Sequence, residues 1–440
     1  MCKYSATPLA PLGPAPELGA HTVEVLAEPP HRPAPVATAP SGAKALEGLK
    51  VLDLSWVMAG PAASRVLADH GATVVHVESA NHVDTARTLQ PFRDDGNGLD
   101  DSGLFNNMNA GKLGLALDLS KPGSREVFHD LVRWADIVLE SFSPRAMRSW
   151  GLDYDSLRQV KPDLLMASSC LLGQTGPHAG LAGFGTMAAA VSGFFNVAGW
   201  ADRAPCGPFG AYTDYVAPKL YLSCLLAAIE HHRVTGEGQY LDFSQAEAAL
   251  HFLTPALLDE VVNGRTAARA GNDDAVFAPH GVYAALGDEQ WVAIACVDDQ
   301  RWQRLCELIG QPSLAGLDAE GRRAARRDLD ELVGAWTATR SVDEVESTLQ
   351  AMGVAAHRVN DSAACVVDPQ LVHRGHFVEV PHATQGTTWV EGSRFVLTST
   401  PGAPERGAPT YGEHVWEVLN GLLGYDADRI ADLAVQELLE

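Results

Sequence analysis

The sequence predicts an α/β protein with a large domain built on a Rossmann-like open parallel sheet and a small α+β domain. From residue 46 to about residue 170, short apolar segments alternate with amphipathic helical segments. This alternation is the pattern of βαβ units that place helices on both faces of a parallel sheet. From about residue 265 the pattern changes to short alternating strands and short helices, which predicts a smaller antiparallel sheet.

The first βαβ unit is predicted from residue 49 onward. Residues 49–54 form an apolar run that suits a buried strand. Pro61 suits the first turn of a helix, because its missing N–H would have no partner there. The helical pattern covers residues 62–69, Gly71 is a suitable stop, and the β-branched residues at 73–77 predict the next strand.

A second unit with the same order of elements follows. Residues 113–117 predict a strand, 122–134 an amphipathic helix, 136–139 a strand and 164–168 a further strand. No G-x-G-x-x-G motif follows the first strand of the protein. A nicotinamide or flavin dinucleotide is therefore disfavoured as a ligand.

Changes in composition and pattern set the expected domain boundaries. Residues 1–45 are rich in Pro and Ala and lack sustained periodicity, which is typical of an extension or linker. Helical patterns dominate from 186 to 262, interrupted at 196–210 by a loop that contains Gly and Pro. The expected organisation is an extension at 1–45, the first part of the large domain at 46–264, the small domain at 265–355, and a return to the large domain at 356–440.

The composition limits the function classes. The chain has 440 residues, 46% of them hydrophobic, which is enough to bury a large core. Its net charge of -23 disfavours nucleic acid as a partner. No run approaches roughly 20 apolar residues and no secretory signal pattern opens the chain, so we expect no membrane partner and a cytoplasmic location. The seven cysteines are scattered and form no C-x-x-C pair, which disfavours a disulfide framework or a zinc cluster, and no H-x-x-x-H or carboxylate cluster supports a metal site. We also expect no tightly bound cofactor.

A short segment near the start of the chain recurs near its end. Residues 15–26 (APELGAHTVEVL) and 408–419 (APTYGEHVWEVL) share Ala, Pro, Gly, His, Glu, Val and Leu in register, 393 residues apart. Internal repeats indicate duplicated structural units. The repeat suggests that the chain begins inside the tail of a preceding, homologous unit.

Several motifs, in order along the chain, resemble the family III CoA-transferases (CaiB/BaiF-like). The opening LEGLKVLD at 46–53 leads to Ala59-Gly60-Pro61 and GATVVHVE at 71–78. Further matching blocks lie at 109–112, 117–119, 140–144, 173–177, 235–242 and 412–419. The resemblance implies a homodimer of interlocked chains that uses acyl-CoA and a carboxylic acid as substrates. In this family an aspartate carboxylate attacks the acyl-CoA thioester, which divides one difficult step into easier ones.

The chain departs from that family at the nucleophile. After G-Q-T-G-P, active relatives have Gly, an aromatic residue and then the nucleophilic Asp, whereas this chain has Gly183, Phe184 and Gly185. In this respect the chain resembles the subunit type of two-subunit relatives that lacks the Asp. Its catalytic residue is therefore unknown, and we expect a homodimer or a heteromer in which an Asp-bearing homologue supplies the carboxylate.

The same resemblance indicates which residues bind CoA. The loop of Trp56, Val57, Met58, Ala59 and Gly60 follows the first strand, where relatives cradle CoA through backbone contacts; the alternative is a simple strand-to-helix turn. The remaining candidates are Asn109, Lys112, Ser141, Phe142, Arg145 and Arg148. Lys112 and the two arginines are candidates for the CoA phosphates, with solvated surface charge as the alternative.

Two side chains are candidates for catalysis in place of Gly185. Asp214 lies at a position where relatives also have an Asp at a helix start, and it is the best substitute carboxylate near the expected site, although its expected role is to cap a helix N-terminus. His178 lies in the G-P loop and has a side chain that acts as acid or base near neutral pH. These residues keep two alternative functions open: an acyl-CoA racemase or isomerase, and a catalytically silent paralogue that binds CoA esters.

Overall fold

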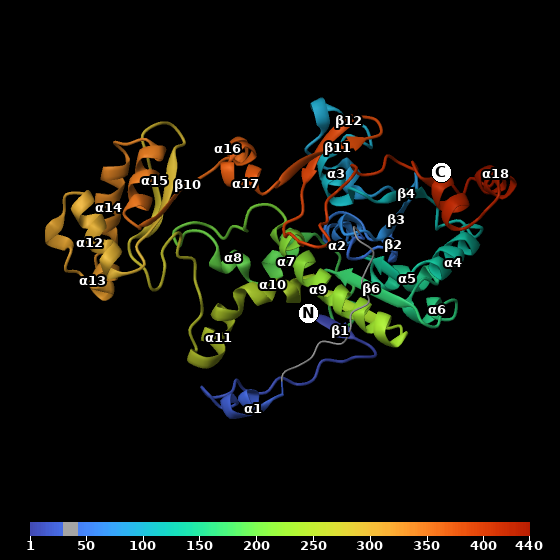
Figure 1. Cartoon of the computed structure of the whole chain (residues 1–440), viewed down its shortest axis with the longest axis horizontal. Helices are drawn as coiled ribbons and strands as arrows, with labels where there is room; N and C mark the ends of the chain where they lie inside the picture. Colours follow the sequence, from blue (N-terminus) through green and yellow to red (C-terminus); the bar gives the residue numbers. More distant parts are fainter. Residues whose placement is uncertain (30–42) are drawn as a thin grey trace. The chain divides into compact units, whose positions relative to one another are not determined.

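The computed structural model describes residues 1–29 and 43–440 (Figure 1). The chain folds into two compact units. Unit 1 comprises Met1–Ser192, Phe209–Thr254 and Gly375–Glu440, and unit 2 comprises Gly193–Pro208 and Pro255–Arg374. Residues 30–42 of the expected extension lie outside the described part of the chain.

Unit 1 is built on a seven-stranded sheet, which confirms the predicted Rossmann-like fold. The strand order is β1-β7-β6-β5-β2-β3-β4. Strands β2 to β7 run parallel to one another, and β1 is antiparallel to β7. The strands are β1 (Cys2–Tyr4), β2 (Lys50–Leu54), β3 (Thr73–Glu78), β4 (Leu113–Ala116), β5 (Ile137–Glu140), β6 (Leu165–Cys170) and β7 (Tyr240–Ser244).

The strand order contains a topological switch point between β2 and β5. The chain moves outward from β2 through β3 to β4, and then returns to place β5 on the other side of β2. The connections that follow β2 and β5 therefore leave in opposite directions. Open α/β sheets bind their ligands in the crevice at this point, beyond the carboxyl ends of the strands. A ligand site is accordingly expected at the loops that follow Leu54 and Glu140.

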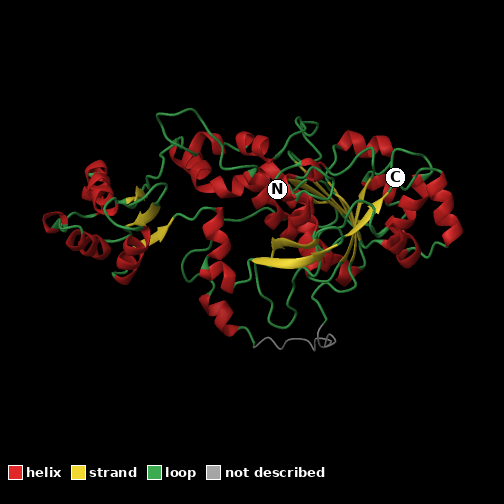
Figure 2. Cartoon of the chain, turned by 90° about the horizontal axis from the view of Figure 1, so that it is seen from above, coloured by secondary structure: helices red, strands yellow, loops and turns green. Residues whose placement is uncertain are grey.

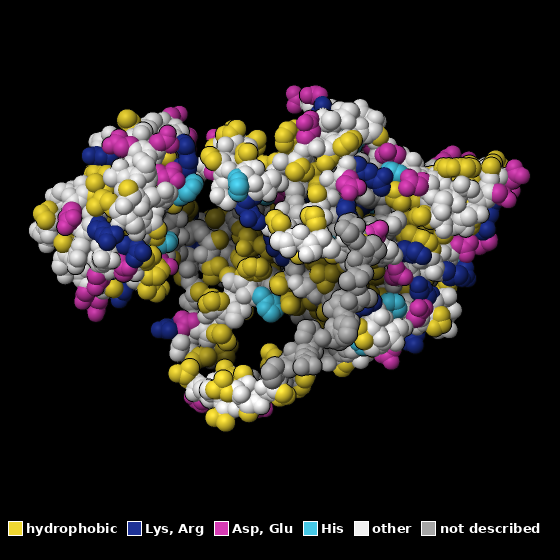
Figure 3. All heavy atoms as spheres, in the orientation of Figure 1, with side chains coloured by type: hydrophobic (Ala, Val, Ile, Leu, Met, Phe, Trp, Pro, Cys, Tyr) yellow, Lys and Arg dark blue, Asp and Glu magenta, His cyan; other side chains and the backbone are white. Residues whose placement is uncertain are grey.

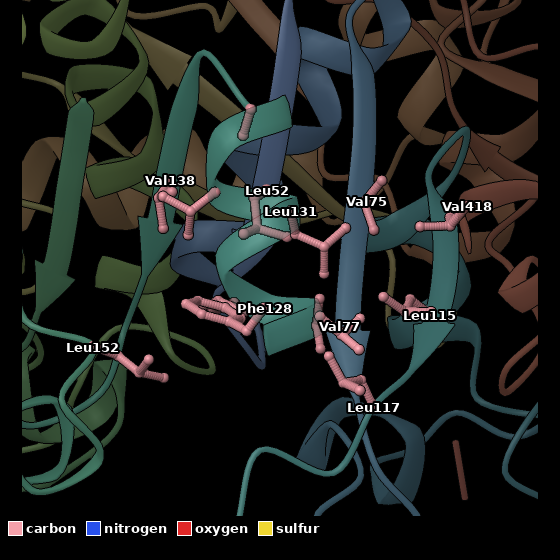
Figure 4. Packing of buried hydrophobic residues seen from close by; sticks show 14 of the residues in the cluster. Leu52, Val75, Val77, Leu115, Leu117, Phe128, Leu131, Val138, Leu152 and Val418 are labelled. Atoms are coloured by element: carbon pink, nitrogen blue, oxygen red, sulfur yellow. The ribbon is translucent and has the colours of Figure 1, made fainter. Parts of the chain in front are cut away.

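Helices cover both faces of the sheet (Figure 2). Successive residues of a strand point to opposite faces. On one face, Leu52, Val75 and Val138 pack against Phe128 and Leu131 (Figure 4). The helices of unit 1 are α1 (Thr22–Ala27), α2 (Ala59–Asp69), α3 (Gly103–Asn109), α4 (Ser124–Trp134), α5 (Pro144–Trp150), α6 (Tyr154–Leu157), α7 (Gly185–Val191), α9 (Tyr212–Thr235), α10 (Gln245–Leu250) and α18 (Ala427–Val435), together with a π-helical segment at Glu417–Leu422.

The beginning of the chain contributes a strand that the sequence did not indicate. Residues 2–4 pair with β7, and Cys2 lies opposite Phe243. Three residues are too few to show a hydrophobic period, so pattern analysis interpreted the whole of 1–45 as an extension or linker. The segment instead covers one edge of the main sheet.

Unit 2 contains a three-stranded antiparallel sheet in the order β10-β9-β8, and unit 1 also contains a hairpin, β11 (Phe377–His382) with β12 (Gly386–Glu391). The core of unit 2 includes Trp302, Leu305, Val333 and Val345. Its elements are α8 (Phe194–Val197), α11 (Thr254–Asn263), β8 (His280–Ala284), β9 (Trp291–Ala295), α12 (Asp299–Leu308), α13 (Ala319–Ala324), α14 (Arg326–Thr337), α15 (Val342–Ala351), β10 (Ala355–Arg358), α16 (Ser362–Val367) and α17 (Pro369–His373).

The described residues provide neither a membrane-spanning helix nor a cluster of metal-ligating side chains. None of the helices they form has the length and apolar character required to cross a bilayer. They also contain no cluster of three or more His, Cys, Asp or Glu side chains arranged to hold a metal ion.

Candidate active site

A pocket of about 240 Å³ opens at the switch point of the sheet in unit 1. Its walls come from the loops that follow β2, β5 and β6, from the segment before α7, and from the starts of α9 and α10. Among the predicted CoA-binding residues, those that line it are Trp56, Val57, Met58, Ala59, Gly60, Ser141 and Phe142. The fold therefore brings together two candidate segments that are about 85 residues apart in the sequence.

The loop after β2 is held by contacts from its surroundings. The backbone N–H of Trp56 donates to Ser141 Oγ at 3.1 Å, and its indole N–H donates to the carbonyl of Val77 at 3.2 Å. The Trp56 and Phe142 rings meet edge to face, with centroids 5.1 Å apart. These contacts tie the loop after β2 to the loop after β5, so the two walls of the pocket are fixed relative to each other.

Val57, at the centre of this loop, has an unusual backbone conformation with φ of 70°. A β-branched residue seldom adopts positive φ, and such strain persists only where the surroundings enforce it. Here Asp84 Oδ1 accepts the Val57 N–H at 2.8 Å and the Ala86 N–H at 2.9 Å. Asp84 is fully buried, and burial raises the pKa of its carboxyl group.

We expect Asp84→Ala to loosen the pocket wall more than Asp84→Asn does. Alanine leaves the buried N–H of Ala86 and the partly buried N–H of Val57 without acceptors, which costs about 1–3 kcal/mol of stability, whereas the asparagine oxygen keeps both hydrogen bonds. Urea unfolding measures the stability, and hydrogen exchange of the segment around Val57 measures the loosening. Equal losses in the two variants, with unchanged exchange, would contradict the role given to Asp84.

Gly185 lies at the first position of α7, beside the pocket wall formed by Gly183 and Phe184. Its N–H donates to Asp214 Oδ2 at 3.2 Å, and its carbonyl accepts the Thr213 hydroxyl at 2.9 Å. A Cβ built on Gly185 would lie 2.6 Å from Asp214 Cγ and 2.7 and 2.8 Å from its two oxygens. The carboxylate of Asp214 thus occupies the space that a side chain at position 185 would require.

Asp214 is a pocket residue, but it is not the helix cap that the sequence suggested. Helix α9 begins at Tyr212 with Ala211 before it and has no side-chain cap, which places Asp214 inside the first turn. Asp214 instead accepts the N–H at the start of α7, a group that no intrahelical partner satisfies. Gln245 Nε2 donates to the other oxygen, Oδ1. Burial raises the pKa of the Asp214 carboxyl group, with Gln245 and the Gly185 N–H opposing the rise.

Two of the predicted CoA-binding residues lie away from the pocket. Lys112 is 0% exposed, and its Nζ lies 2.9 Å from Asp53 Oδ2 and 2.8 Å from Asn109 Oδ1. Asn109 is also fully buried. The prediction that Lys112 binds a CoA phosphate is therefore wrong in this conformation, because the ammonium neutralises a carboxylate inside the protein. The motif at residues 109–112 matches the family in sequence, but it does not reveal that Lys112 is buried beside Asp53.

The remaining candidates are exposed. His178 lies in an exposed turn and is not among the residues that line the pocket. Arg145 and Arg148 are exposed on α5, and Arg148 lines a second cavity of about 530 Å³ in unit 1. Their role at the CoA phosphates stays a prediction.

Glu140, at the end of β5, lines the second cavity and was not indicated as a site residue by the sequence. Its side chain is buried, Oε2 accepts the Phe142 N–H at 2.7 Å, and Oε1 accepts Gln174 Nε2 at 3.2 Å. Burial raises the pKa of Glu140 to about 7. The sequence does offer one signal for Glu140, because this residue directly follows the strand predicted at residues 136–139, and the carboxyl end of the observed strand β5 faces the switch point.

This raised pKa predicts how stability depends on pH. Between pH of about 4.5 and 7 the folded chain holds a proton on Glu140 that the unfolded chain has lost, so stability falls as pH rises through this window. A shift of this size corresponds to about 3 kcal/mol. We expect Glu140→Gln to remove this part of the slope in urea unfolding, whereas Glu331→Gln, at an exposed position on α14, should leave it. A slope that survives Glu140→Gln would refute the assignment.

The fold and the pocket define an α/β protein with a pocket at the switch point of a Rossmann-like sheet. The chain matches CoA-transferase family III over residues 46–415, and it belongs to that family. The resemblance noted in the sequence is thereby confirmed.

Three similar proteins illustrate the relationship. A probable CoA-transferase of Mycobacterium tuberculosis is 32% identical over 438 residues, which cover 97% of this chain and 54% of the relative, so the chain spans about half the length of that relative. The beta subunit of succinyl-CoA–L-malate CoA-transferase from Chloroflexus aurantiacus is 31% identical over 407 residues, covering 90% of this chain and 98% of the subunit. The crystal structure of a CaiB/BaiF family protein from Brucella suis has a TM-score of 0.79 at 28% identity, covering 86% of this chain and all of that chain.

Proposed function

We propose that this chain is a component of a CoA-transferase that moves CoA from an acyl-CoA to a carboxylic acid, and that a homologous partner supplies the nucleophilic aspartate. The observation that carries the proposal is Gly185. It lies at the position of the family's nucleophile, beside a pocket at the switch point, and it has no side chain that could form a covalent intermediate.

The reaction requires a carboxylate that is bonded first to the acyl group and then to CoA. The partner's aspartate attacks the acyl-CoA carbonyl and expels CoA as the thiolate, leaving an acyl-aspartyl anhydride. The thiolate then attacks the aspartyl carbonyl, releasing the first acid and leaving an aspartyl-CoA thioester. The carboxylate of the second acid attacks the aspartyl-CoA thioester and expels the CoA thiolate, which gives a new anhydride. The thiolate then attacks the acyl carbonyl of this anhydride, which releases the new acyl-CoA and regenerates the aspartate.

This chain supplies the walls of the pocket in that sequence. Asp84 and Ser141 hold the loop from Trp56 to Gly60, which leads into α2. Backbone N–H groups at the start of a helix favour anionic groups, which suits a CoA ester beside this loop. The carboxylate of Asp214 is held by Gln245 and Gly185, so it shapes the pocket wall without standing free in it.

The names of relatives support a succinyl-CoA donor and a two-subunit enzyme. The Chloroflexus relative is the beta subunit of an enzyme named for succinyl-CoA and L-malate. By similarity to this relative, we propose that the enzyme containing this chain uses a dicarboxylic acyl-CoA as donor and a small carboxylic acid as acceptor. We also propose that the chain forms a heteromer with an Asp-bearing homologue.

The test is to assay CoA transfer from succinyl-CoA to a panel of small acids with the chain alone and together with an Asp-bearing family III subunit. We expect no transfer by the chain alone and transfer by the pair. Hydroxylamine trapping and peptide mapping should place the acyl group on the partner's aspartate. A covalent adduct on this chain by itself would defeat the proposal.

Asp214 supports one second candidate, proton transfer at the α-carbon of an acyl-CoA. Asp214 is one of the residues that line the pocket, and burial raises the pKa of its carboxyl group, which would suit an acid or base once its hydrogen bonds to Gln245 and Gly185 are released. Exchange of the α-proton of an acyl-CoA in D₂O measures this activity. Exchange that is abolished by Asp214→Asn would favour this function over transfer.

A further inference from the structure

The two copies of the internal repeat share a turn and the start of a helix, although the helix continues as an α-helix in the first copy and as a π-helix in the second. Gly19 and Gly412 occupy equivalent positions and have φ of 80° and 66°. Three backbone hydrogen bonds recur in register: Ala20 N to Glu17 O, Thr22 N to Gly19 O and Val25 N to His21 O in the first copy, and Glu413 N to Thr410 O, Val415 N to Gly412 O and Val418 N to His414 O in the second. The two copies are therefore similar in backbone structure as well as in sequence over residues 17–25 and 410–418.

The second copy is an integral part of the core of unit 1. His414 Nδ1 accepts the N–H of Gly114 at 3.1 Å, and the His414 N–H donates to the Gly114 carbonyl at 3.0 Å. Val418 and Leu419 are fully buried in the cluster that contains Val75 and Leu115 (Figure 4). The tail thus fills a groove along β4, the edge strand of the sheet.

Close packing in this groove depends on Gly114. A Cβ at Gly114 would lie 2.8 Å from Pro409 Cβ, so a larger residue would displace the tail. Pro409 is one of the residues that the two copies share, because Pro16 is its equivalent.

The first copy exposes the side chains that the second copy buries. Val25 is 61% exposed and Leu26 is 80% exposed, whereas their equivalents Val418 and Leu419 are 0% exposed. No residue of α1 is buried. Hydrophobic side chains are visible on the surface of this segment in Figure 3. An isolated helix of six residues is marginal in water, so such a segment gains its stability from a contact.

We propose that residues 15–26 dock on a second CoA-transferase family III unit, in the groove beside its edge strand that residues 408–419 fill in this chain. The matching His, Val and Leu make the same contacts with the receiving unit. The groove of the same chain is not the receptor, because its own tail occupies it. The docking of residues 15–26 rests on the homologous partner unit of the proposed function. Its tests measure folding and binding and not CoA transfer, so the docking proposal and the proposed function can fail separately.

The fit can be tested within one chain. In a chimera, residues 408–419 are replaced by the sequence of residues 15–26; in the matched control, the same twelve residues are inserted in reverse order. We expect the chimera to fold and to melt well above the control, followed by circular dichroism. Equal melting of the two would overturn the proposal, since the first copy would then not suit the groove.

Docking between chains needs a receptor with a loosened tail. The probe is this full-length chain with Val418→Ala and Leu419→Ala, or with Leu419→Ala alone if the double variant is unfolded by circular dichroism. We expect the unaltered chain to bind it in analytical ultracentrifugation, and Val25→Asp with Leu26→Asp in the binding chain to weaken that association at least tenfold.

Leu9→Asp with Leu12→Asp is the matched control, because these leucines are also exposed and precede the segment. This control pair should leave binding unchanged. Absence of binding to the folded probe, or equal weakening by both pairs of substitutions, would overturn the proposal.

Discussion

Lys112→Met is expected to destabilise unit 1 by about 3–5 kcal/mol, because it removes one partner of a buried ion pair and leaves the other. Lys112 and Asp53 are both fully buried, and their charged atoms are 2.9 Å apart. Burial alone would raise the pKa of Asp53, but Lys112, His76 and the hydrogen bonds of Ser55 outweigh it and hold the pKa below its ordinary value. Without Lys112 the carboxylate must stay charged in the protein interior, with the hydrogen bonds of Ser55 and Ser64 left to stabilise it, or take up a proton.

Urea unfolding at neutral pH measures this loss, and two variants serve as controls. Lys121→Met breaks a partly exposed pair with Glu437 and should cost less than about 1 kcal/mol. Asp53→Asn combined with Lys112→Met removes both charges and should recover part of the loss, which a double-mutant cycle quantifies. If Lys112→Met cost no more than Lys121→Met, the pair would not contribute in the way described.

The same pair shows where prediction from sequence succeeded and where it stopped. The strand at 49–54 was recognised from its apolar run, which the observed β2 at Lys50–Leu54 confirms. Asp53 interrupts that run, and a carboxylate in a buried strand requires a buried partner. The sequence does not say which partner, because Lys112 lies 59 residues away and meets Asp53 only after β3 and β4 have been added.

The pocket was predicted in part for a related reason. The loop from Trp56 to Gly60 and the pair Ser141 and Phe142 follow strands, and a parallel sheet brings such loops to one edge. Asp84 and Gln245 escaped notice because their roles depend on hydrogen bonds across 27 and 31 residues, to Val57 and Asp214. No local pattern encodes contacts of this kind.

Gly185→Asp is expected to destabilise the chain and to give no CoA transfer. The new Cβ would meet the Asp214 carboxyl group at 2.6 Å, and overpacking of this kind costs about 1–3 kcal/mol. The new carboxyl group would adjoin that of Asp214, and two adjoining buried carboxylates do not both ionise readily, so the pKa of one of them rises further. The variant should therefore lose more stability as pH rises above the ordinary range of carboxyl pKa values, about 4.

Two further variants separate volume from charge. Gly185→Ala adds the Cβ without the carboxylate, so its loss of stability should not grow with pH. Gly185→Asp combined with Asp214→Gly gives the new side chain the space that Asp214 now fills, and should recover stability in urea unfolding. In this double variant a carboxylate stands at the position of the family's nucleophile, so hydroxylamine trapping after incubation with succinyl-CoA is expected to find an adduct there. Transfer by Gly185→Asp alone, at unchanged stability, would show that Asp214 moves aside freely and does not block the position.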